Sequence, residues 1–169
     1  PAQFYVGLAK AKNIRGFAKA GQKLDIPYIL VNTNGKLLSE KELPYLVSNI
    51  EYTLTREEWT MVHEQSVDDT IYTRYERTDV EDAKGEIKVQ PSGDISLNPQ
   101  KSGWYTLTVT GKDNRGNKVI SKSEFYVTGS GSSWFDQYNS YSLKLTPDKS
   151  QYNPGETANV LLESPLPAG

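Results

Sequence analysis

The sequence predicts an all-β protein: an antiparallel two-sheet sandwich of immunoglobulin-like or fibronectin-III-like architecture, followed by a partial second β unit. Apolar and polar residues alternate along many short segments, which is the period of a half-buried strand. The chain contains 11 Tyr and many Thr, Val and Ile residues, the types that strands favour. Its 13 Gly and 9 Pro recur at short intervals and mark turns between the strands.

Eight strands are expected before residue 130, each an alternating or apolar run bounded by turn residues. In chain order they span residues 3–9, 23–32, 49–56, 70–77, 86–89, 94–97, 104–112 and 119–128. Their inward-facing side chains predict a core of Phe4, Val6, Ile26, Leu30, Tyr52, Leu54, Tyr105, Leu107, Val109, Phe125 and Val127. The run at 23–32 is apolar on both faces and is therefore expected at the centre of a sheet, although Pro27 is unusual there.

Two turns and one ambiguous segment connect these strands. The dipeptide Asn34-Gly35 suits a type I′ hairpin turn, and residues 113–117 predict a β-turn between two strong strands. Residues 55–58 resemble a helix capping box, so residues 59–64 could form a short helix. Residues 49–56 already form a predicted strand, so a strand is the favoured interpretation of this segment as well.

Residues 130–133 are a small-residue stretch and the expected linker between a sandwich at 1–129 and a second unit at 134–169. The second unit offers one strand ending near residue 146 and another at 158–163. Two strands bury too little apolar surface to be stable alone. We therefore expect this unit to be the incomplete opening of another domain, with Trp134 packed between the two units.

The connection between those two strands contains the sequence Tyr152-Asn153-Pro154-Gly155-Glu156. Pro154 fixes φ at the second position of a turn, and Gly155 accepts a positive φ at the third. The spacing predicts a type II turn, in which we expect a structural role for Tyr152, Pro154 and Gly155.

Composition excludes several functional classes. The formal net charge is −2, so there is no basic field for nucleic acid. No apolar stretch is long enough to span a bilayer, which argues against direct membrane insertion. The chain has no cysteine, which excludes disulfides and thiolate zinc sites. Its 169 residues are enough for one core and a small additional unit.

Candidate catalytic and metal-binding residues are few. His63 is the only histidine, and its neighbours Trp59 and Met61 predict a structural histidine in a half-buried segment. Acidic clusters at 68–69 and 79–82 could bind calcium weakly, but a pair of solvated loops is the favoured interpretation. We expect no catalytic residue, no cofactor and no metal site, and hence a protein that is not an enzyme.

A tryptophan, a Leu-x-Leu strand, the run Asp-Lys-x-x-Tyr-x-Pro-Gly-Glu-Thr-Ala and a final Ser-Pro form one long motif. Its residues are Trp134, Leu143, Leu145, Asp148, Lys149, Tyr152, Pro154, Gly155, Glu156, Thr157, Ala158, Ser164 and Pro165. The motif resembles the opening of the macroglobulin-like domain associated with the bait region in the alpha-2-macroglobulin family, here of a bacterial type. Residues 4–8, 103–107, 113–116 and 125–129 match the preceding macroglobulin-like domain more loosely.

Proteins of this family trap proteases: a protease cuts an exposed bait segment, the molecule rearranges, and a buried thioester can bond to the attacker. The thioester needs a cysteine, which this chain lacks, and no bait region is evident in it. The resemblance implies a structural scaffold segment of a broad-spectrum endopeptidase inhibitor. It also implies an extracytoplasmic location, periplasmic or secreted, with any membrane anchor elsewhere in a longer protein. The implied partners are neighbouring macroglobulin-like domains and, through the longer protein, target proteases.

Two alternatives remain open at this point. An immunoglobulin-like adhesion or carbohydrate-binding module of a surface protein would show an exposed aromatic face or a calcium site, and it leaves the long C-terminal motif unexplained. A noncatalytic sandwich of a secreted hydrolase would accompany a catalytic domain elsewhere. Fold alone does not separate these functions.

Overall fold

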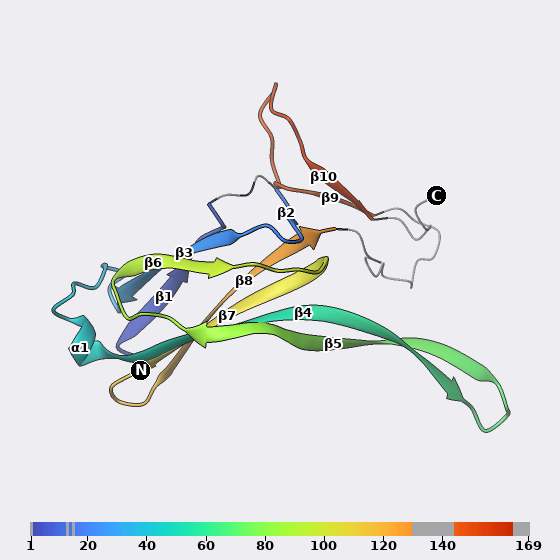
Figure 1. Ribbon diagram of the computed structural model, residues 1–169, viewed down its shortest axis with the longest axis horizontal. Helices are drawn as coiled ribbons and strands as arrows, with labels where there is room; N and C mark the ends of the chain where they lie inside the picture. The colour runs from blue at the N-terminus through green and yellow to red at the C-terminus, as the bar shows by residue number, and fades with distance from the viewer. Residues whose placement is uncertain (1, 13, 15, 130–143, 164–169) are drawn as a thin grey trace.

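The computed structural model describes residues 2–12, 14, 16–129 and 144–163. In these residues the chain forms strands and one short helix (Figure 1). In order they are β1 (Phe4–Leu8), β2 (Ala18–Lys19), β3 (Leu24–Asn32), α1 (Leu43–Leu46), β4 (Val47–Gln65), β5 (Ile71–Glu86), β6 (Ser92–Leu97), β7 (Gly103–Asp113), β8 (Lys118–Thr128), β9 (Lys144–Pro147) and β10 (Val160–Glu163).

Two sheets pack face to face and make the sandwich. One has the strand order β2-β8-β7-β4-β5, and the other has the order β1-β3-β6. All pairs in them are antiparallel except β2 with β8, which is parallel. Strands β9 and β10 form a separate two-stranded antiparallel sheet. The predicted fold class, an antiparallel sandwich followed by a further β unit, is confirmed.

The core lies between the two sheets of the sandwich. Its fully buried side chains come from both, and they include Phe4, Leu24, Ile26, Tyr28, Leu30, Ile50, Leu54, Tyr105, Leu107, Val109 and Val127. Every residue of the predicted core is buried except Tyr52 and Phe125, which are half-buried and pack against its margin. The period-two alternation therefore identified the inward faces correctly.

Strand β3 is the central strand of its sheet, as its apolar sequence predicts. Pro27 is accommodated there, opposite Asp94 in the register, and its carbonyl accepts the Ala9 N–H at 2.9 Å. Only the inner face of β3 is covered, because Ile29 on the outer face is exposed.

The strand expected at 86–89 is not formed. Strand β5 ends at Glu86 and β6 begins at Ser92, so Ser92 and Gly93, which were expected in a turn with Pro91, belong to β6. Gly93 fits against the ring of Tyr28, where an added Cβ would lie 3.0 Å from the Tyr28 Oη. The Tyr28 hydroxyl donates to the Lys88 carbonyl at 3.0 Å, which holds the connection in place.

Three hairpin turns share one geometry, a three-residue loop whose last residue has positive φ. That residue is Gly35 (φ 76°), Asp69 (φ 63°) or Gly116 (φ 84°). The type I′ turn predicted at Asn34-Gly35 is wrong, because Asn34 does not have a positive φ. The Asn32 Oδ1 instead accepts the N–H groups of Asn34 and Lys36 at 3.0 Å each, which stabilises the longer loop.

The turn at 113–117 repeats this arrangement with a buried carboxylate. Asp113 is 1% exposed and accepts N–H groups of Gln3, Arg115 and Asn117 at 2.8–3.2 Å. Burial alone would raise the Asp113 pKa, but the hydrogen bonds from Asn117, Arg115 and Gln3 bring it below its ordinary value. The predicted β-turn is confirmed, and its carboxylate is occupied by backbone donors.

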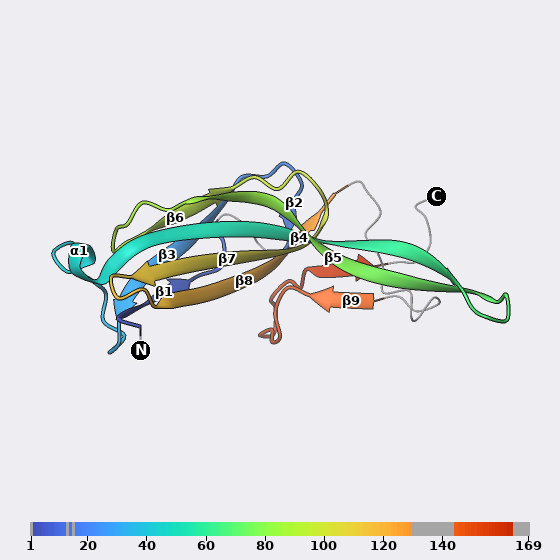
Figure 2. The same cartoon turned by 90° about the horizontal axis from the view of Figure 1, so that it is seen from below.

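The most prominent feature outside the sandwich is the arm, which we define as residues 57–79 of the β4–β5 hairpin. Strand β4 pairs with β7 only up to Arg56, whereas its pairing with β5 continues to Gln65 and Ile71. Figures 1 and 2 both show the arm extending well past the other strands. The interpretation of residues 59–64 as strand, not helix, is confirmed.

Candidate functional site

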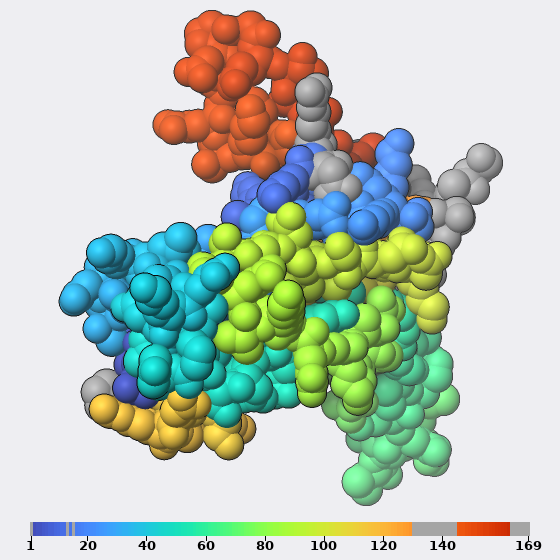
Figure 3. All heavy atoms as spheres, turned by 60° about the vertical axis from the view of Figure 1, so that its left-hand side comes forward, coloured from blue at the N-terminus to red at the C-terminus, as the bar shows by residue number. Residues whose placement is uncertain are grey.

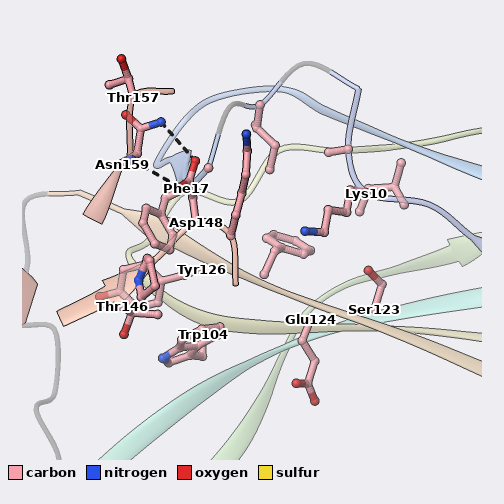
Figure 4. A pocket seen from close by; sticks show the side chains of 17 residues that line it. Lys10, Phe17, Trp104, Ser123, Glu124, Tyr126, Thr146, Asp148, Thr157 and Asn159 are labelled. Atoms are coloured by element: carbon pink, nitrogen blue, oxygen red, sulfur yellow. Dashed lines mark hydrogen bonds between the residues drawn. The ribbon is translucent and has the colours of Figure 1, made fainter. Parts of the chain in front are cut away.

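A groove lies between the sandwich and the second sheet. Its volume is about 760 Å³, and its lining includes Lys10, Phe17, Trp104 and Tyr126 from the sandwich and Thr146–Lys149, Thr157 and Asn159 from the other side (Figure 4). Figure 3 shows the second sheet, in orange-red, standing on the N-terminal residues drawn in blue. The groove is thus the place where the two parts of the described chain meet.

An aromatic wall forms the sandwich side of the groove. Trp104 on β7 and Tyr126 on β8 are register partners, with ring centroids 5.2 Å apart and planes inclined by 67°. Phe17, from the loop before β2, meets Tyr126 edge-on at 6.2 Å. Such edge-to-face pairs fix the ring positions and leave the apolar face of the wall toward the groove. Phe17 and Trp104 are half-buried, so the wall is accessible.

The opposite side of the groove is organised by Asp148. Its Oδ1 accepts a hydrogen bond from the Tyr152 hydroxyl. Its Oδ2 accepts a hydrogen bond from the Asn159 side-chain amide at 3.1 Å (Figure 4). The Asp148 N–H donates to the Asn159 carbonyl at 2.9 Å. The Tyr152 hydroxyl lowers the pKa of Asp148, with Asn159 adding to the effect, and Asp148 in turn raises the pKa of Tyr152.

The turn after Asp148 is closed by the residues of the sequence motif. The Glu156 N–H donates to the Asn153 carbonyl at 3.0 Å, and Gly155 has φ 87°. The Glu156 carboxylate accepts the Asn153 N–H at 2.8 Å and lies 3.3 Å from the Lys149 ammonium. The hydrogen bond from the Asn153 N–H is the main cause that lowers the pKa of Glu156, and Lys149 lowers it further. These residues form a small polar cluster that stiffens one wall of the groove.

The two parts touch closely at Gly16. A Cβ added to Gly16, which has φ 88°, would lie 3.1 Å from the Asp148 Cβ and 3.6 Å from the Asn159 Cβ. Two separate features therefore favour glycine at this position: the positive φ of the backbone and the close approach of Asp148.

The sequence motif contributes to only one side of this groove, through Asp148, Lys149 and Thr157. The three residues with an expected structural role, Tyr152, Pro154 and Gly155, do not line it. Trp134 and the linker at 130–133 are outside the described residues, as are Ser164 and Pro165. Sequence reasoning missed Phe17 and Tyr126, because neither lies in a motif and only the fold brings them together.

Four expectations about local structure in and beyond this region need correction. Strand β9 continues through Pro147, which was expected in the turn, and β10 begins at Val160, two residues later than expected. The acidic residues at 79–82 belong to strand β5 and not to a loop. His63 is exposed on the arm, where its Nδ1 lies 3.1 Å from the Thr73 Oγ1, and is not half-buried.

The groove offers apolar and aromatic contacts with a few charged groups at its margin. The only histidine of the sequence does not line it. Among the described residues, no group of three or more His, Cys, Asp or Glu side chains could hold a metal ion. None of the helices in the described part of the chain is long and apolar enough to cross a membrane. The groove is suited to packing side chains between two β units.

Fold and groove together define a β-sandwich with an aromatic wall that faces a further two-stranded sheet across a groove. No family model matches the sequence. The chain is 24% identical over 150 residues to an alpha-2-macroglobulin homolog of Nostoc, which is 88% of this chain and 7% of that protein. It is also 24% identical over 139 residues to an alpha-2-macroglobulin homolog of Deinococcus radiodurans, which is 80% of this chain and 12% of that protein. The resemblance to bacterial alpha-2-macroglobulins is confirmed.

Solved structures agree on the fold. Salmonella alpha-2-macroglobulin reacted with methylamine aligns with 98% of this chain and 10% of its own, with a TM-score of 0.52 and 20% identity. The native conformation of E. coli alpha-2-macroglobulin aligns with 98% of this chain and 11% of its own, with a TM-score of 0.53 and 20% identity. The chain therefore spans about a tenth of the length of the proteins it matches.

Proposed function

We propose that the chain is a structural scaffold segment of a protease-trapping alpha-macroglobulin. The observation that carries this proposal is the similarity to two alpha-2-macroglobulin homologs over most of the chain, together with the same fold in two solved bacterial alpha-2-macroglobulins. The segment would supply neither a thioester, since it has no cysteine, nor a catalytic group. Its task would be to hold neighbouring domains in a defined arrangement.

The groove suggests how the segment would do this. Asp148 is tied to Tyr152 and Asn159, and the same residue abuts Gly16 of the sandwich. A change in the angle between the two units would move this rigid cluster across the aromatic wall. The groove would thus set the preferred angle, which a rearrangement after bait cleavage would preserve or change.

The second sheet supports a proposed division into domains. Leu145 and Leu162 are register partners on one face of β9–β10 and are 64% and 55% exposed. A two-stranded sheet with such a face is at best marginally stable, so further strands of a longer protein would cover it. We assign residues 1–129 to one macroglobulin-like domain, 130–133 to a linker and 134–169 to the start of another.

Trp134 follows the end of β8 by only a few residues, so it is our candidate for packing at the junction of the two domains. Trp134→Ala should loosen the contact between the units while leaving the sandwich folded. The same proposal places the longer protein in the periplasm or outside the cell, with other macroglobulin-like domains and target proteases as its partners.

The test uses the longer protein that contains this segment. It is mixed with an endopeptidase, and the activity of the endopeptidase is measured on a large protein and on a small peptide substrate. A trap is expected to protect the protein substrate much more than the peptide. Equal activity on both substrates with and without the longer protein would contradict the proposal. Gly16→Ala in the longer protein, with Gly21→Ala as its control, then tests whether the groove contributes to trapping.

A further inference from the structure

The arm has two unlike faces, and the register of its strands assigns each side chain to one of them. Side chains alternate along a strand, and β4 and β5 pair without a bulge in the arm. Its paired odd-numbered residues therefore share one face, and its even-numbered residues share the other. Two ion pairs agree with this assignment. Arg77 lies 2.9 Å from Glu57 on the odd-numbered face. Arg74 lies 2.6 Å from Glu64 on the even-numbered face.

The odd-numbered face has an apolar and aromatic centre. Trp59 and Met61 are successive residues of this face, and Tyr75 is the register partner of Met61. Ile71 lies on the same face nearer the tip. Met61 is 42% exposed and Ile71 is 68% exposed, whereas Trp59 and Tyr75 are half-buried. A two-stranded hairpin is marginally stable by itself, and an exposed apolar patch commonly marks an interaction site. We therefore expect a second layer to cover this face.

The even-numbered face carries most of the charge. Arg74 lies between Glu64 and Glu76, at 2.6 Å and 2.7 Å from their carboxylate oxygens. These ion pairs are about half exposed, and Tyr72 is exposed beside them near the tip. Contact with an apolar partner would remove these charges from water at a cost. The odd-numbered face is therefore the one suited to docking.

The odd-numbered face of the arm is continuous with the aromatic wall of the groove. Arg56 on β4 is the register partner of Tyr105 on β7, and both are buried on the inner face of the sheet. The next position along each strand, Glu57 and Trp104, therefore lies on the outer face. These two residues line a common hollow of about 220 Å³. Trp59 follows Glu57 on this face, so aromatic side chains continue from the wall into the arm.

The second sheet already occupies one end of this surface. Thr146–Lys149 lie across the groove from Trp104 and Tyr126. Strand β10 is directed toward the side of the molecule to which the arm extends (Figures 1 and 2). Leu145 and Leu162 give this sheet an exposed apolar face of its own. Strands that complete the unit begun by β9 and β10 would therefore be placed beside the arm.

The dimensions of the arm fit a sheet of another domain. The arm part of β4, residues 57–65, spans about 30 Å at the rise of an extended strand. A strand of ordinary length spans about 17–20 Å, and packed sheets lie about 10 Å apart. Figure 2 shows that the arm stands clear of the sandwich over this length. The arm can thus lie along a whole sheet of a neighbouring domain.

We propose that the odd-numbered face of the arm is a docking surface for the domain that β9 and β10 begin. The occupant is an apolar sheet face of that domain, which contacts the aromatic wall at one end and Trp59, Met61 and Ile71 at the other. The inference rests on the proposed scaffold function, because it requires the longer protein. Its test measures coverage of the arm and not protease trapping, so the two proposals can fail separately.

Oxidation of Met61 tests whether the face is covered, because Met61 is the only methionine of the sequence. Peroxide converts an accessible methionine to its sulfoxide, which mass spectrometry of the peptide containing Met61 detects. The rate is compared between the 169-residue chain and the longer protein. Oxidation in the longer protein should be slower by about tenfold or more. Equal rates would overturn the docking proposal, even in a longer protein that traps endopeptidases.

Photo-cross-linking identifies the occupant. Met61→benzoylphenylalanine in the longer protein keeps an apolar side chain at this position and should attach, on irradiation, to peptides of the unit that contains β9 and β10. The control Thr60→benzoylphenylalanine places the same group on the even-numbered face, one residue away, and should give about a tenth of that yield or less. Attachment to a second copy, attachment to a different domain, or equal yields at the two positions would overturn the proposal.

Discussion

Gly16 is the position where a single methyl group should separate the two units of the chain. Gly16 has φ 88° and Gly21 has φ 78°. An alanine at either position adopts a left-handed conformation at a cost of about 1–2 kcal/mol. A Cβ at Gly21 has nothing within 4 Å, whereas one at Gly16 would meet the Asp148 Cβ at 3.1 Å and the Asp148 Oδ2 at 3.3 Å. Gly21→Ala is therefore a matched control for the backbone cost.

The contact between a Cβ at position 16 and Asp148 cannot be relieved by rotating the Asp148 side chain. The Asp148 Cβ is fixed to its backbone, and its carboxylate is held by Tyr152 and Asn159. The second sheet would have to move as a unit. Both variants should lose about 1–2 kcal/mol of stability in urea unfolding. Only Gly16→Ala should shift the NMR signals of the Trp104 indole N–H and the Asn159 amide. Identical signals in the two variants would refute the contact between Gly16 and Asp148.

Four further outcomes are expected. Gly155→Val should destabilise the second sheet by about 1–3 kcal/mol, because φ 87° disfavours a β-branched residue, and unchanged exchange protection of the β9–β10 amides would contradict this. His63→Gln should alter stability by less than about 0.5 kcal/mol, since His63 is exposed, and a larger drop in the urea midpoint would give it a role the structure does not show. Leu107→Ala should cost about 2–5 kcal/mol in urea unfolding, because Leu107 is fully buried, and a cost near zero would remove it from the core. Burial raises the pKa of Tyr105 to about 12, so its neutral form stabilises the fold below pH 10 and this contribution is lost as the pH rises from 10 to 12. Absorbance at 295 nm should show one tyrosine titrating after the others, and Tyr105→Phe should abolish that step.

The sequence predicted the sandwich because its signal is local. Period-two alternation marks which side chains face inward, and hydrophobic burial favours that face whatever the strand order. The alternation of β7 predicted Tyr105, Leu107 and Val109 correctly for this reason. The signals for strand ends are also local. The strand predicted at 86–89 is nevertheless wrong, because Pro91 and Gly93 were interpreted as the turn, whereas β6 already begins at Ser92.

Features that depend on distant residues could not be predicted. The loop before β2 brings Phe17 to Tyr126, more than a hundred residues later, and no sequence periodicity records that contact. The length of the arm could not be predicted either. The strand pattern of β4 does not change at Arg56, where its pairing with β7 stops. The turn at Asn34-Gly35 follows the hydrogen bonds that the Asn32 Oδ1 accepts from backbone N–H groups, and not the usual dipeptide preference.

The C-terminal end of strand β8 is held on both edges, by β7 up to Val127 and by β2 at Val127 and Thr128. Strand β7 pairs with it on one side and the two residues of β2 on the other, with the Ala20 N–H donating to the Thr128 carbonyl at 2.7 Å and the Thr128 hydroxyl to the Ala18 carbonyl at 3.0 Å. A tension applied to the chain after Thr128, along the direction of β8, would load these hydrogen bonds in shear and all together. A strand held on one edge only can instead be peeled away bond by bond. The short parallel pair therefore makes the exit from the sandwich a mechanically resistant point, at which a pull from the C-terminal side is passed to the whole five-stranded sheet.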